Sequence, residues 1–312
     1  MAVYLVTGGA GFVGSHLSRA LIERGHQVRI LDDLSTGSLD NLPAGAEIVR
    51  GNVADVEQVA VAMEGAVGCF HLAAVASVER STRDWFAAHC TNMSGTIAVL
   101  DAARRGRDPP IPVVYASSAA VYGNSEQLPL KELARPQPRS AYGADKYGSE
   151  LHGRVAFEVH QIPTTGLRFF NVYGPRQHPA SPYSGVISIF CDRLLKGQPI
   201  EIFGDGLQTR DFIFVSDVAD ALLAAMENTH DCGEVFNVCT GRGTTILELA
   251  CLVGELCGHE PEIHFKPLRA GEIAHSRGDP DRMRSRFGLG EPVDLRSGLI
   301  ATLSWMRMLG IG

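Results

Sequence analysis

Short hydrophobic runs alternate with longer amphipathic segments through the first half of the chain. The short runs have the length of buried strands, and hydrophobic residues recur at helical spacing between them. Alternation of this kind is typical of a parallel sheet with helices on both faces, so we predict a doubly wound α/β fold. Strands are predicted at residues 3–7, 27–32, 47–51, 67–73, 112–118 and 164–170. Helices are predicted at residues 14–25, 56–63, 92–105 and 142–159.

The pattern changes after residue 170. Residues 173–185 are rich in Pro, Gly and Ser, and we predict a long loop, which in a compact domain is more often functional than idle. We predict a first domain at residues 1–170 and a smaller α/β lobe at 171–312, with returns to the larger sheet near residues 211–240. Ligands of such folds bind beyond the carboxyl ends of the strands. Shorter elements follow, with strands at 200–204, 211–215 and 234–238 and helices at 217–228, 245–257 and 294–308.

The composition excludes several classes of protein. The net charge is −7 and Lys and Arg form no run, which argues against a nucleic acid or an anionic membrane surface as partner. No hydrophobic run approaches the ~20 residues that span a membrane. The chain opens directly on a hydrophobic strand, and its seven cysteines are odd in number and lack CxxC spacing, so we expect a cytoplasmic protein with reduced thiols. The histidines show no metal-ligand spacing, and we predict no metal.

A glycine-rich turn joins the first strand to the first helix. Gly8, Gly11 and Gly14 occur in "VTGGAGFVGSHL" at the spacing GxxGxxG, which lets the backbone approach a pyrophosphate at a helix N-terminus. Alone, this pattern also fits a tight turn without a ligand. Asp32 follows 18 residues after Gly14, close to the ~20 residues expected for the acid that binds the adenosine ribose. With Asp33 beside it, a 2′-phosphate would be repelled, so a Rossmann-type domain that binds NAD is predicted.

A serine, a tyrosine and a lysine form the candidate chemical centre. The strand in "VVYASSAAVYG" ends on Ser117 and Ser118, and Tyr142 and Lys146 follow in "SAYGADKYGSE". Residues four apart share one face of a helix, so both side chains can enter the same cleft. The ammonium and the oxidised nicotinamide ring would both favour a phenolate, which lets the tyrosine act as a base. Taken alone, the YxxxK pair also fits a solvated helix face.

At this point the chain resembles the extended short-chain dehydrogenase/reductase family, and within it the nucleotide-sugar 4-epimerases typified by UDP-galactose 4-epimerase. The resemblance covers nearly the whole chain, and its motifs occur in the family's order. They are "TGGAGFVGSH", "LDDLSTG", "HLAAVASVERS", "NMSGT", "SSAAVYG", "YGADK", "LRFFNVYGPRQ", "IFGDGLQTRDFIFVSDV" and "RAGEIAHSRGDPDRM".

The resemblance implies a cofactor site and a substrate site. In it, Tyr142, Lys146 and Ser118 are catalytic, and NAD stays tightly bound. A solvated surface remains an alternative for the arginines, and a core position for the aromatic ring at 203. The implied cofactor-binding residues are Gly8, Gly11, Phe12, Val13, Gly14, Asp32, Asp33, Asn52, Val53, Leu72, Ala73, Ala74, Asn92, Ser117, Tyr142, Lys146 and Phe169. The implied substrate-binding residues are Ser118, Asn171, Val186, Ile202, Phe203, Arg210, Arg269, Glu272 and Ser276.

Small differences from related enzymes indicate the reaction. Dehydratases of the family carry acids where this chain has Ala119 and Ala120, so elimination is disfavoured and epimerisation at C4 is predicted. Ser276, where bulky aromatics exclude N-acetyl groups, implies that UDP-GlcNAc and UDP-GalNAc are accepted besides UDP-glucose and UDP-galactose. UDP-glucuronate 4-epimerases carry Thr and Arg where this chain has Asn171 and His178, so that alternative is weaker.

Two further expectations concern partners. In the family, helices corresponding to residues 90–105 and 143–159 pair across a two-fold axis as a four-helix bundle, so a homodimer is predicted; a monomer that buries these faces internally is the alternative. A non-catalytic NAD-sensing protein of the same fold is a second functional class, because fold does not fix function. Such proteins commonly lose the tyrosine or the lysine, and this chain keeps both.

Overall fold

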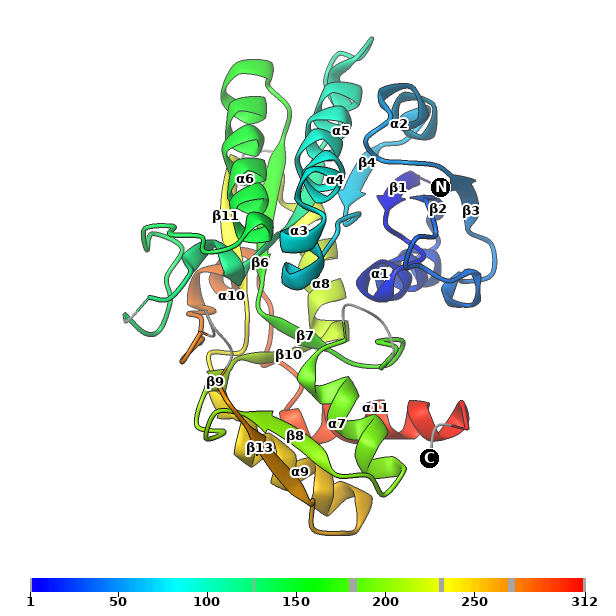
Figure 1. Ribbon diagram of the computed structural model, residues 1–312. Coiled ribbons are helices and arrows are strands. Elements are labelled where there is room, and N and C mark those ends of the chain that lie inside the picture. The colour runs from blue at the N-terminus through cyan, green and yellow to red at the C-terminus, as the bar shows by residue number, and fades with distance from the viewer. Residues whose placement is uncertain (1, 126, 180–183, 230–232, 269–272, 311–312) are drawn as a thin grey trace.

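A seven-stranded sheet forms the centre of the molecule in the computed structural model, which describes residues 2–125, 127–179, 184–229, 233–268 and 273–310. All of its strand pairs are parallel, in the order β11-β6-β5-β4-β1-β2-β3 (Figure 1). The predicted Rossmann-type doubly wound sheet is confirmed. Its strands are β1 (Val3–Thr7), β2 (Gln27–Asp32), β3 (Glu47–Arg50), β4 (Gly68–His71), β5 (Val113–Ser118), β6 (Thr164–Phe169) and β11 (Gly233–Val238).

Helices cover both faces of this sheet because neighbouring residues of each strand point to opposite faces. In β1, Leu5 packs with one layer of helices and Val6 with the other. Both side chains are fully buried, which explains why the strands read as continuous hydrophobic runs. One layer contains α1 (Phe12–Glu23), α8 (Val215–Glu227) and α10 (Asp281–Phe287). The other contains α2 (Val56–Met63), α5 (Gly95–Arg104) and α6 (Ala141–His160).

The helix predicted at residues 92–105 is a regular α-helix only from Gly95, and the chain before it contains short helices that were not predicted. Two short helices, α3 (Val78–Arg83) and α4 (Trp85–His89), lead into a π-helical turn at Cys90–Ser94 before α5 begins. Such turns interrupt α-helices frequently at functional sites. Short 3₁₀ turns occur at Leu39–Asn41 and Ala119–Tyr122.

The second half of the chain adds a smaller α/β lobe with its own hydrophobic core below the sheet (Figure 1). Its strands form pairs: β7 (Asn171–Tyr173) with β10 (Phe212–Phe214), β8 (Ile200–Phe203) with β13 (Ile263–Lys266), and β9 (Thr209–Arg210) with β12 (Thr244–Thr245). Its helices are α7 (Val186–Leu195), α9 (Ile246–Cys257) and α11 (Leu295–Met308).

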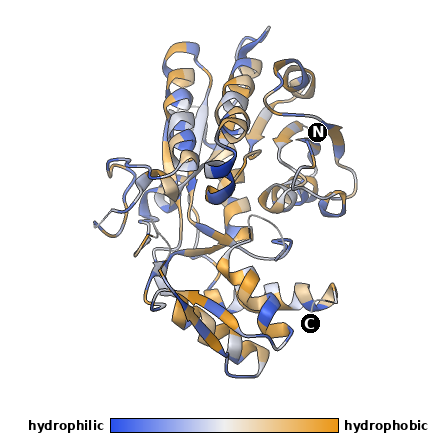
Figure 2. Cartoon of the chain, in the orientation of Figure 1, coloured by the Kyte–Doolittle hydropathy of each residue, from blue (hydrophilic) through white to orange (hydrophobic). Residues whose placement is uncertain are grey.

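Local sequence explains the helix ends in this lobe. The hydroxyl of Thr245 accepts a hydrogen bond from the backbone N–H of Glu248, whose carboxylate accepts one from the N–H of Thr245, and this capping box starts α9. Gly258, with a φ of 86°, ends it in the left-handed conformation. The faces of these helices that turn inward are hydrophobic (Figure 2).

Residues 211–240 divide between the two parts of the molecule. β11 is the edge strand of the large sheet, and α8 packs on one of its faces. β10 does not join that sheet but pairs with β7. The division of the chain near residue 170 stays a prediction.

Candidate functional site

The glycine-rich turn packs too closely for side chains. Gly8 has a φ of 71°, and a Cβ atom there would lie 2.7 Å from the backbone nitrogen of Ala73. A Cβ atom on Gly14 would overlap the carbonyl oxygen of Gly8. The turn therefore brings bare backbone, followed by the N-terminus of α1 at Phe12, to the edge of the sheet. Such a cradle fits the pyrophosphate of a dinucleotide.

Asp32 ends the neighbouring strand β2 and is almost fully buried. Its carboxylate accepts hydrogen bonds of 2.9 Å from the backbone N–H groups of Ala10 and Leu34. Burial raises the pKa of Asp32, while these hydrogen bonds lower it in part. The side chain is thereby held at the mouth of the glycine turn, where the ribose of a dinucleotide would lie.

A cleft of about 460 Å³ lies between the glycine turn, the ends of β2, β4 and β6, and α6. It brings together predicted residues from segments up to 163 positions apart, from Gly8 to Asn171. The predicted residues that line it are Gly8, Gly11, Phe12, Val13, Gly14, Asp32, Asp33, Val53, Leu72, Ala73, Ala74, Ser118, Tyr142, Phe169 and Asn171.

Tyr142 and Lys146 lie on the first turns of α6, whose N-cap is Ser140. The Nζ atom of Lys146 is 6.0 Å from the centre of the Tyr142 ring and donates a 2.8 Å hydrogen bond to the carbonyl oxygen of Ala116. Burial lowers the pKa of Lys146 to about 8, and nearby Asp145 opposes this shift. A buried ammonium near a phenol favours the phenolate form, which is the form that can accept a proton.

His71 lies beneath this pair and has a structural environment. Its ring is buried and hydrogen-bonds the hydroxyl of Thr7 at 2.8 Å and that of Thr96 at 3.1 Å. Burial, and then the charge of Lys146, lowers the pKa of His71 to about 3. The ring is therefore neutral and holds the two threonines in place.

Four predicted cofactor residues do not line the cleft. Ser117 precedes Ser118 on β5 and therefore faces the other side of the sheet, where it donates a 2.5 Å hydrogen bond to Glu150. Asn52 accepts a hydrogen bond from the N–H of Ala54 and shapes a local turn, while its neighbour Val53 lines the cleft. The predicted contacts of Ser117 and Asn52 with the cofactor stay predictions.

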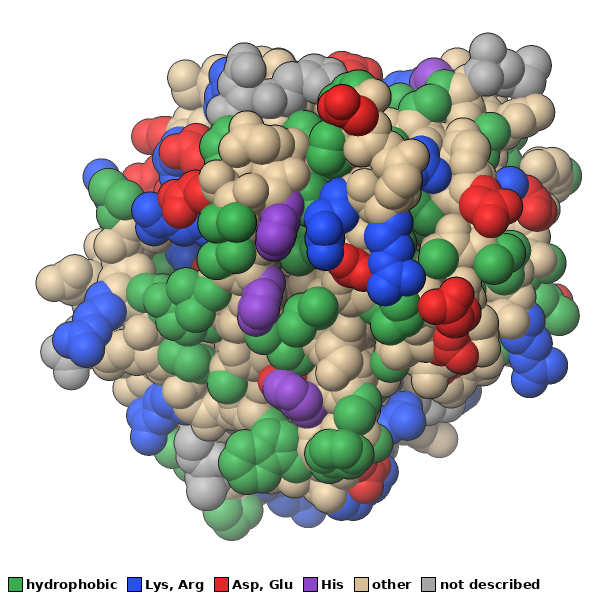
Figure 3. Space-filling view, turned by 90° about the horizontal axis from the view of Figure 1, so that it is seen from above, with side chains coloured by type: hydrophobic (Ala, Val, Ile, Leu, Met, Phe, Trp, Pro, Cys, Tyr) green, Lys and Arg blue, Asp and Glu red, His purple; other side chains and the backbone are tan. Residues whose placement is uncertain are grey.

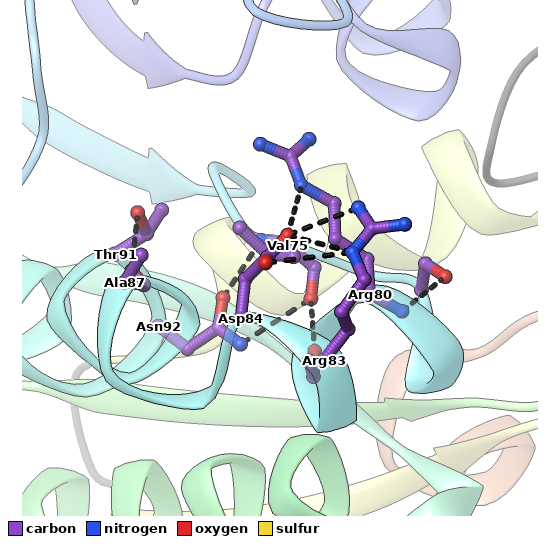
Figure 4. A network of polar contacts seen from close by, with 9 residues as sticks. Val75, Arg80, Arg83, Asp84, Ala87, Thr91 and Asn92 are labelled. Atoms are coloured by element: carbon purple, nitrogen blue, oxygen red, sulfur yellow. Dashed lines mark hydrogen bonds and ion pairs between the residues drawn. The ribbon is translucent and has the colours of Figure 1, made fainter.

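The other two, Lys146 and Asn92, support the cleft from behind. Asn92, in the π-helical turn, accepts a 2.7 Å hydrogen bond from the N–H of Val75 and donates one of 3.3 Å to its carbonyl oxygen (Figure 4). The side chain is fully buried and fixes the loop after β4. The ammonium of Lys146 hydrogen-bonds β5, so Tyr142, rather than Lys146, is the residue of this pair that lines the cleft.

A second cavity of about 410 Å³ adjoins the first, and Asn171 lines both. Its described lining includes two arginines, Arg193 and Arg210, together with the acid Glu201 and the ring of Phe203. Guanidinium groups of this kind bind phosphate oxygens. The predicted substrate residues that line it are Asn171, Val186, Ile202, Phe203 and Arg210.

Three predicted substrate residues remain to be placed: Ser276, Arg269 and Glu272. The N–H of Ser276 donates a 3.1 Å hydrogen bond to the carbonyl oxygen of Thr209, next to Arg210, but Ser276 is not among the described residues that line either cavity. Arg269 and Glu272 lie outside the described residues. Ser276 is thus near the second cavity without forming its wall.

Several lining residues were missed by the sequence reasoning. Ser35 and Thr36 follow directly after the two acids of β2, within the "LDDLSTG" motif, so the motif itself was the signal. Arg80 of α3 and Gln177 of the loop after β7 also line the cleft, and Arg193 lines the second cavity. Arg80 and Gln177 stand in the motifs "HLAAVASVERS" and "LRFFNVYGPRQ" without being singled out there, whereas no motif contains Arg193.

Among the residues that the structure describes, His, Cys, Asp and Glu form no group of three or more that would hold a metal ion.

Across the same ranges, each helix is too short or too polar to cross a bilayer.

Comparison with known proteins finds consistent relatives. Residues 4–239 match the model of the NAD-dependent epimerase/dehydratase family. The chain is 37% identical over 305 residues to a putative UDP-glucose 4-epimerase of Methanocaldococcus jannaschii, covering 97% of this chain and 98% of that protein.

Two solved structures are also similar along their whole length. One is a UDP-glucose 4-epimerase from Thermotoga maritima with UDP-glucose, at 37% identity and a TM-score of 0.92, covering 98% of this chain and 99% of that one. The other is a UDP-N-acetylglucosamine 4-epimerase from Methanobrevibacter ruminantium in complex with UDP-N-acetylmuramic acid, at 32% identity and a TM-score of 0.93, covering 99% of each chain.

Proposed function

The chain belongs to the NAD-dependent epimerase/dehydratase family, and on this premise we propose that it inverts C4 of UDP-hexoses, UDP-glucose and UDP-galactose as well as their N-acetylated forms. One observation carries the proposal. The cleft that contains Tyr142 and Ser118 meets the arginine-lined cavity at Asn171, so a sugar held at the junction lies between a base and a diphosphate site.

The cofactor and the class of enzyme follow from the family. NAD, expected from the glycine turn and Asp32, is confirmed by the family's own description. The relatives named UDP-glucose 4-epimerases are isomerases, as the sequence predicted for this chain. That NAD remains bound through turnover is part of the proposal.

The chain's own residues hold the cofactor and exchange the proton. The glycine turn receives the pyrophosphate, and Asp32 accepts hydrogen bonds from the adenosine ribose. NAD⁺ held by these residues would supply a reversible hydride acceptor for C4 of the sugar. Tyr142, as the phenolate favoured by Lys146, takes the proton of the C4 hydroxyl, and Ser118 hydrogen-bonds the same oxygen. The proton returns from Tyr142 after the sugar has turned.

Inversion requires a fixed nucleotide and a free sugar. Arg210 and Phe203 of the second cavity are proposed to hold the diphosphate and the uracil ring. These remote contacts keep the oxidised sugar in the site while it presents its other face to the cleft. Ala119 and Ala120 offer no acid at the end of β5, so a leaving hydroxyl receives no proton there and elimination does not compete.

Turnover of UDP-galactose by the purified protein without added cofactor tests this proposal. We expect UDP-glucose to form, and Tyr142→Phe to lower kcat by about 10²–10⁴-fold, the usual contribution of a general base. Tyr147→Phe is the matched control, because Tyr147 lies on the same helix and packs against a hydrophobic cluster but is not among the described residues that line the cleft. Absence of UDP-glucose together with absence of NAD after denaturation would refute the proposal.

Substrate breadth rests on Ser276. We propose that its small side chain, which lies near the second cavity without being part of its described wall, leaves room for an acetamido group. A similar solved structure is named a UDP-N-acetylglucosamine 4-epimerase. Ser276→Tyr is expected to abolish turnover of UDP-GlcNAc while UDP-galactose is still converted, and Ser276→Ala should leave both activities unchanged. Equal loss of both activities in the tyrosine variant would contradict this role.

We also propose that the protein is a homodimer joined through α5 and α6. Both helices expose hydrophobic side chains, among them Ile97, Leu151, Val155 and Val159, which are 42–65% exposed. Seen from the end of the molecule where the tips of α5 and α6 lie, hydrophobic and histidine side chains gather side by side (Figure 3). Light scattering should give twice the chain mass of 33.5 kDa, and Val155→Asp should give a monomer. A monomeric wild-type protein would contradict the dimer.

A further inference from the structure

Arg80 is a positively charged residue that lies outside the glycine turn and for which the resemblance implies no role. It lies on α3, just after the loop that Asn92 fixes, and its side chain is 34% exposed. Among the described residues that line the cleft, Arg80 is the one with a positive charge, whereas Asp32 and Asp33 are the acids. Tyr142 and Gly8 line the same cleft.

The first cleft and the second cavity differ in the positive side chains that line them, as expected if one binds a dinucleotide and the other a nucleotide sugar. A dinucleotide carries two phosphate charges, and the N-terminus of α1 supplies the equivalent of only about half a positive charge. The second cavity has its own arginines, Arg193 and Arg210, for the diphosphate of a nucleotide sugar. Among the described residues that line the first cleft, Arg80 is the cation that could complement the second phosphate charge. We propose that Arg80 binds the pyrophosphate of the dinucleotide, an inference that rests on the proposed function.

Two contacts of Arg80 lie within its own short segment of the chain. Its backbone N–H donates a 3.1 Å hydrogen bond to the N-cap hydroxyl of Ser77, and its Nε atom lies 4.0 Å from the carboxylate of Asp84. Arg83 holds the same carboxylate more closely, at 3.0 Å (Figure 4). The pKa of Asp84 is accordingly lowered by Arg83 first and by Arg80 last.

Arg83 supplies a matched control. It lies on the same short helix and carries the same charge, but it is 69% exposed and is absent from the described lining of the cleft. A general effect of charge on the anionic cofactor would act through both arginines, whereas a direct contact acts through Arg80 alone. The comparison of Arg80→Gln with Arg83→Gln therefore separates the two effects.

The affinity of the protein for NAD⁺ tests the inference, measured by calorimetry and by release of NAD⁺ from the purified holoenzyme. Arg80→Gln is expected to weaken binding of NAD⁺ and of ADP-ribose by about tenfold to a hundredfold, as for the loss of one charge-assisted hydrogen bond. Binding of adenosine, which lacks the pyrophosphate, should change by less than about twofold. Arg83→Gln should bind NAD⁺ within about twofold of the wild type, because exposed ion pairs contribute little.

Other outcomes overturn the inference. Arg80→Gln with unchanged affinity for NAD⁺, or with an equal loss for adenosine, would show that Arg80 does not contact the pyrophosphate. A raised KM for UDP-galactose at unchanged NAD⁺ affinity would assign Arg80 to the substrate instead. Because cofactor affinity is measured without turnover, failure of the proposed epimerase activity would be seen separately, in the wild-type protein.

Discussion

Arg168 and Glu150 form a buried ion pair beneath the candidate site, and breaking it should destabilise the protein strongly. Arg168 on β6 donates two parallel hydrogen bonds, of 2.8 and 2.7 Å, to the carboxylate of Glu150 on α6. The two side chains are 3% and 6% exposed. Arg168 also donates to the hydroxyl of Tyr122, and Ser117 donates to Glu150, so the group spans two strands and a helix. Burial opposes the charge of Arg168, but the bonds to Glu150 outweigh it and raise its pKa.

The expected magnitude follows from the burial of the partner left behind. Arg168→Met keeps the length of the side chain but leaves the carboxylate of Glu150 buried and uncompensated, which costs about 3–5 kcal/mol. With an unfolding entropy of ~2.1 cal/mol/K per residue, the 312 residues give ~0.65 kcal/mol/K. The melting temperature should therefore fall by about 5–8 °C.

Thermal and urea unfolding of the holoenzyme measure this change. The double variant Glu150→Gln/Arg168→Met should be destabilised by less than the sum of the single variants, because it removes both charges together. Arg154→Met is the matched control: Arg154 pairs with Glu158 at 2.7 Å on the same helix, but the pair is 70% and 53% exposed and should contribute less than about 1 kcal/mol. If Arg168→Met unfolds within about 1 kcal/mol of the wild type, the buried pair does not stabilise the fold as argued.

Three further predictions concern backbone packing and pH. Gly14→Ala should lose bound NAD and destabilise the protein by about 1–3 kcal/mol, because its Cβ would overlap the carbonyl of Gly8; a stable variant that retains NAD contradicts the close packing. Burial raises the pKa of half-buried Asp217 to about 6. Stability is therefore lost as the pH rises from the pKa of the unfolded carboxyl through about 6, because the unfolded chain ionises first. Asp217→Asn should stabilise the protein by about 1 kcal/mol at pH 7.5 and by nothing below pH 4 in thermal unfolding. His71, with its pKa lowered to about 3, stays neutral when folded, so stability falls as the pH drops below 6.5, and His71→Asn should flatten that dependence; an unchanged slope would refute it.

The sequence predicted the central sheet well because each of its strands is buried on both faces. The bounds of β1, β2 and α2 agree with the predicted segments, since continuous hydrophobic runs leave little choice of structure. Pairing between distant strands was less predictable. β10 has the same hydrophobic character as a strand of the large sheet, but three residues do not specify a partner, and the fold pairs it with β7.

The site was predicted where motifs carry backbone constraints and missed where the fold alone brings residues together. Gly8 and Asp32 belong to one turn and its neighbouring strand, so their spacing indicates their function. Arg193 reaches the second cavity from α7 and belongs to no motif, and Arg80, although it stands in "HLAAVASVERS", has no spacing to another site residue that would indicate a function. The π-helical turn that places Asn92 also leaves no pattern, because its hydrophobic residues still recur at nearly helical intervals.

The pleat of two strands explains why adjacent residues of one motif have different duties. On β5, Ser118 lines the cleft while Ser117 hydrogen-bonds Glu150. On β6, Phe169 lines the cleft while Arg168 hydrogen-bonds Glu150. Glu150 follows Lys146 by one helical turn, so the ion pair holds the face of α6 that carries the catalytic pair. The strand ends that present the serine and the helix that presents the phenol are thus joined by one buried charge network. Their relative position is set by directional hydrogen bonds rather than by hydrophobic packing alone, which tolerates small shifts more readily.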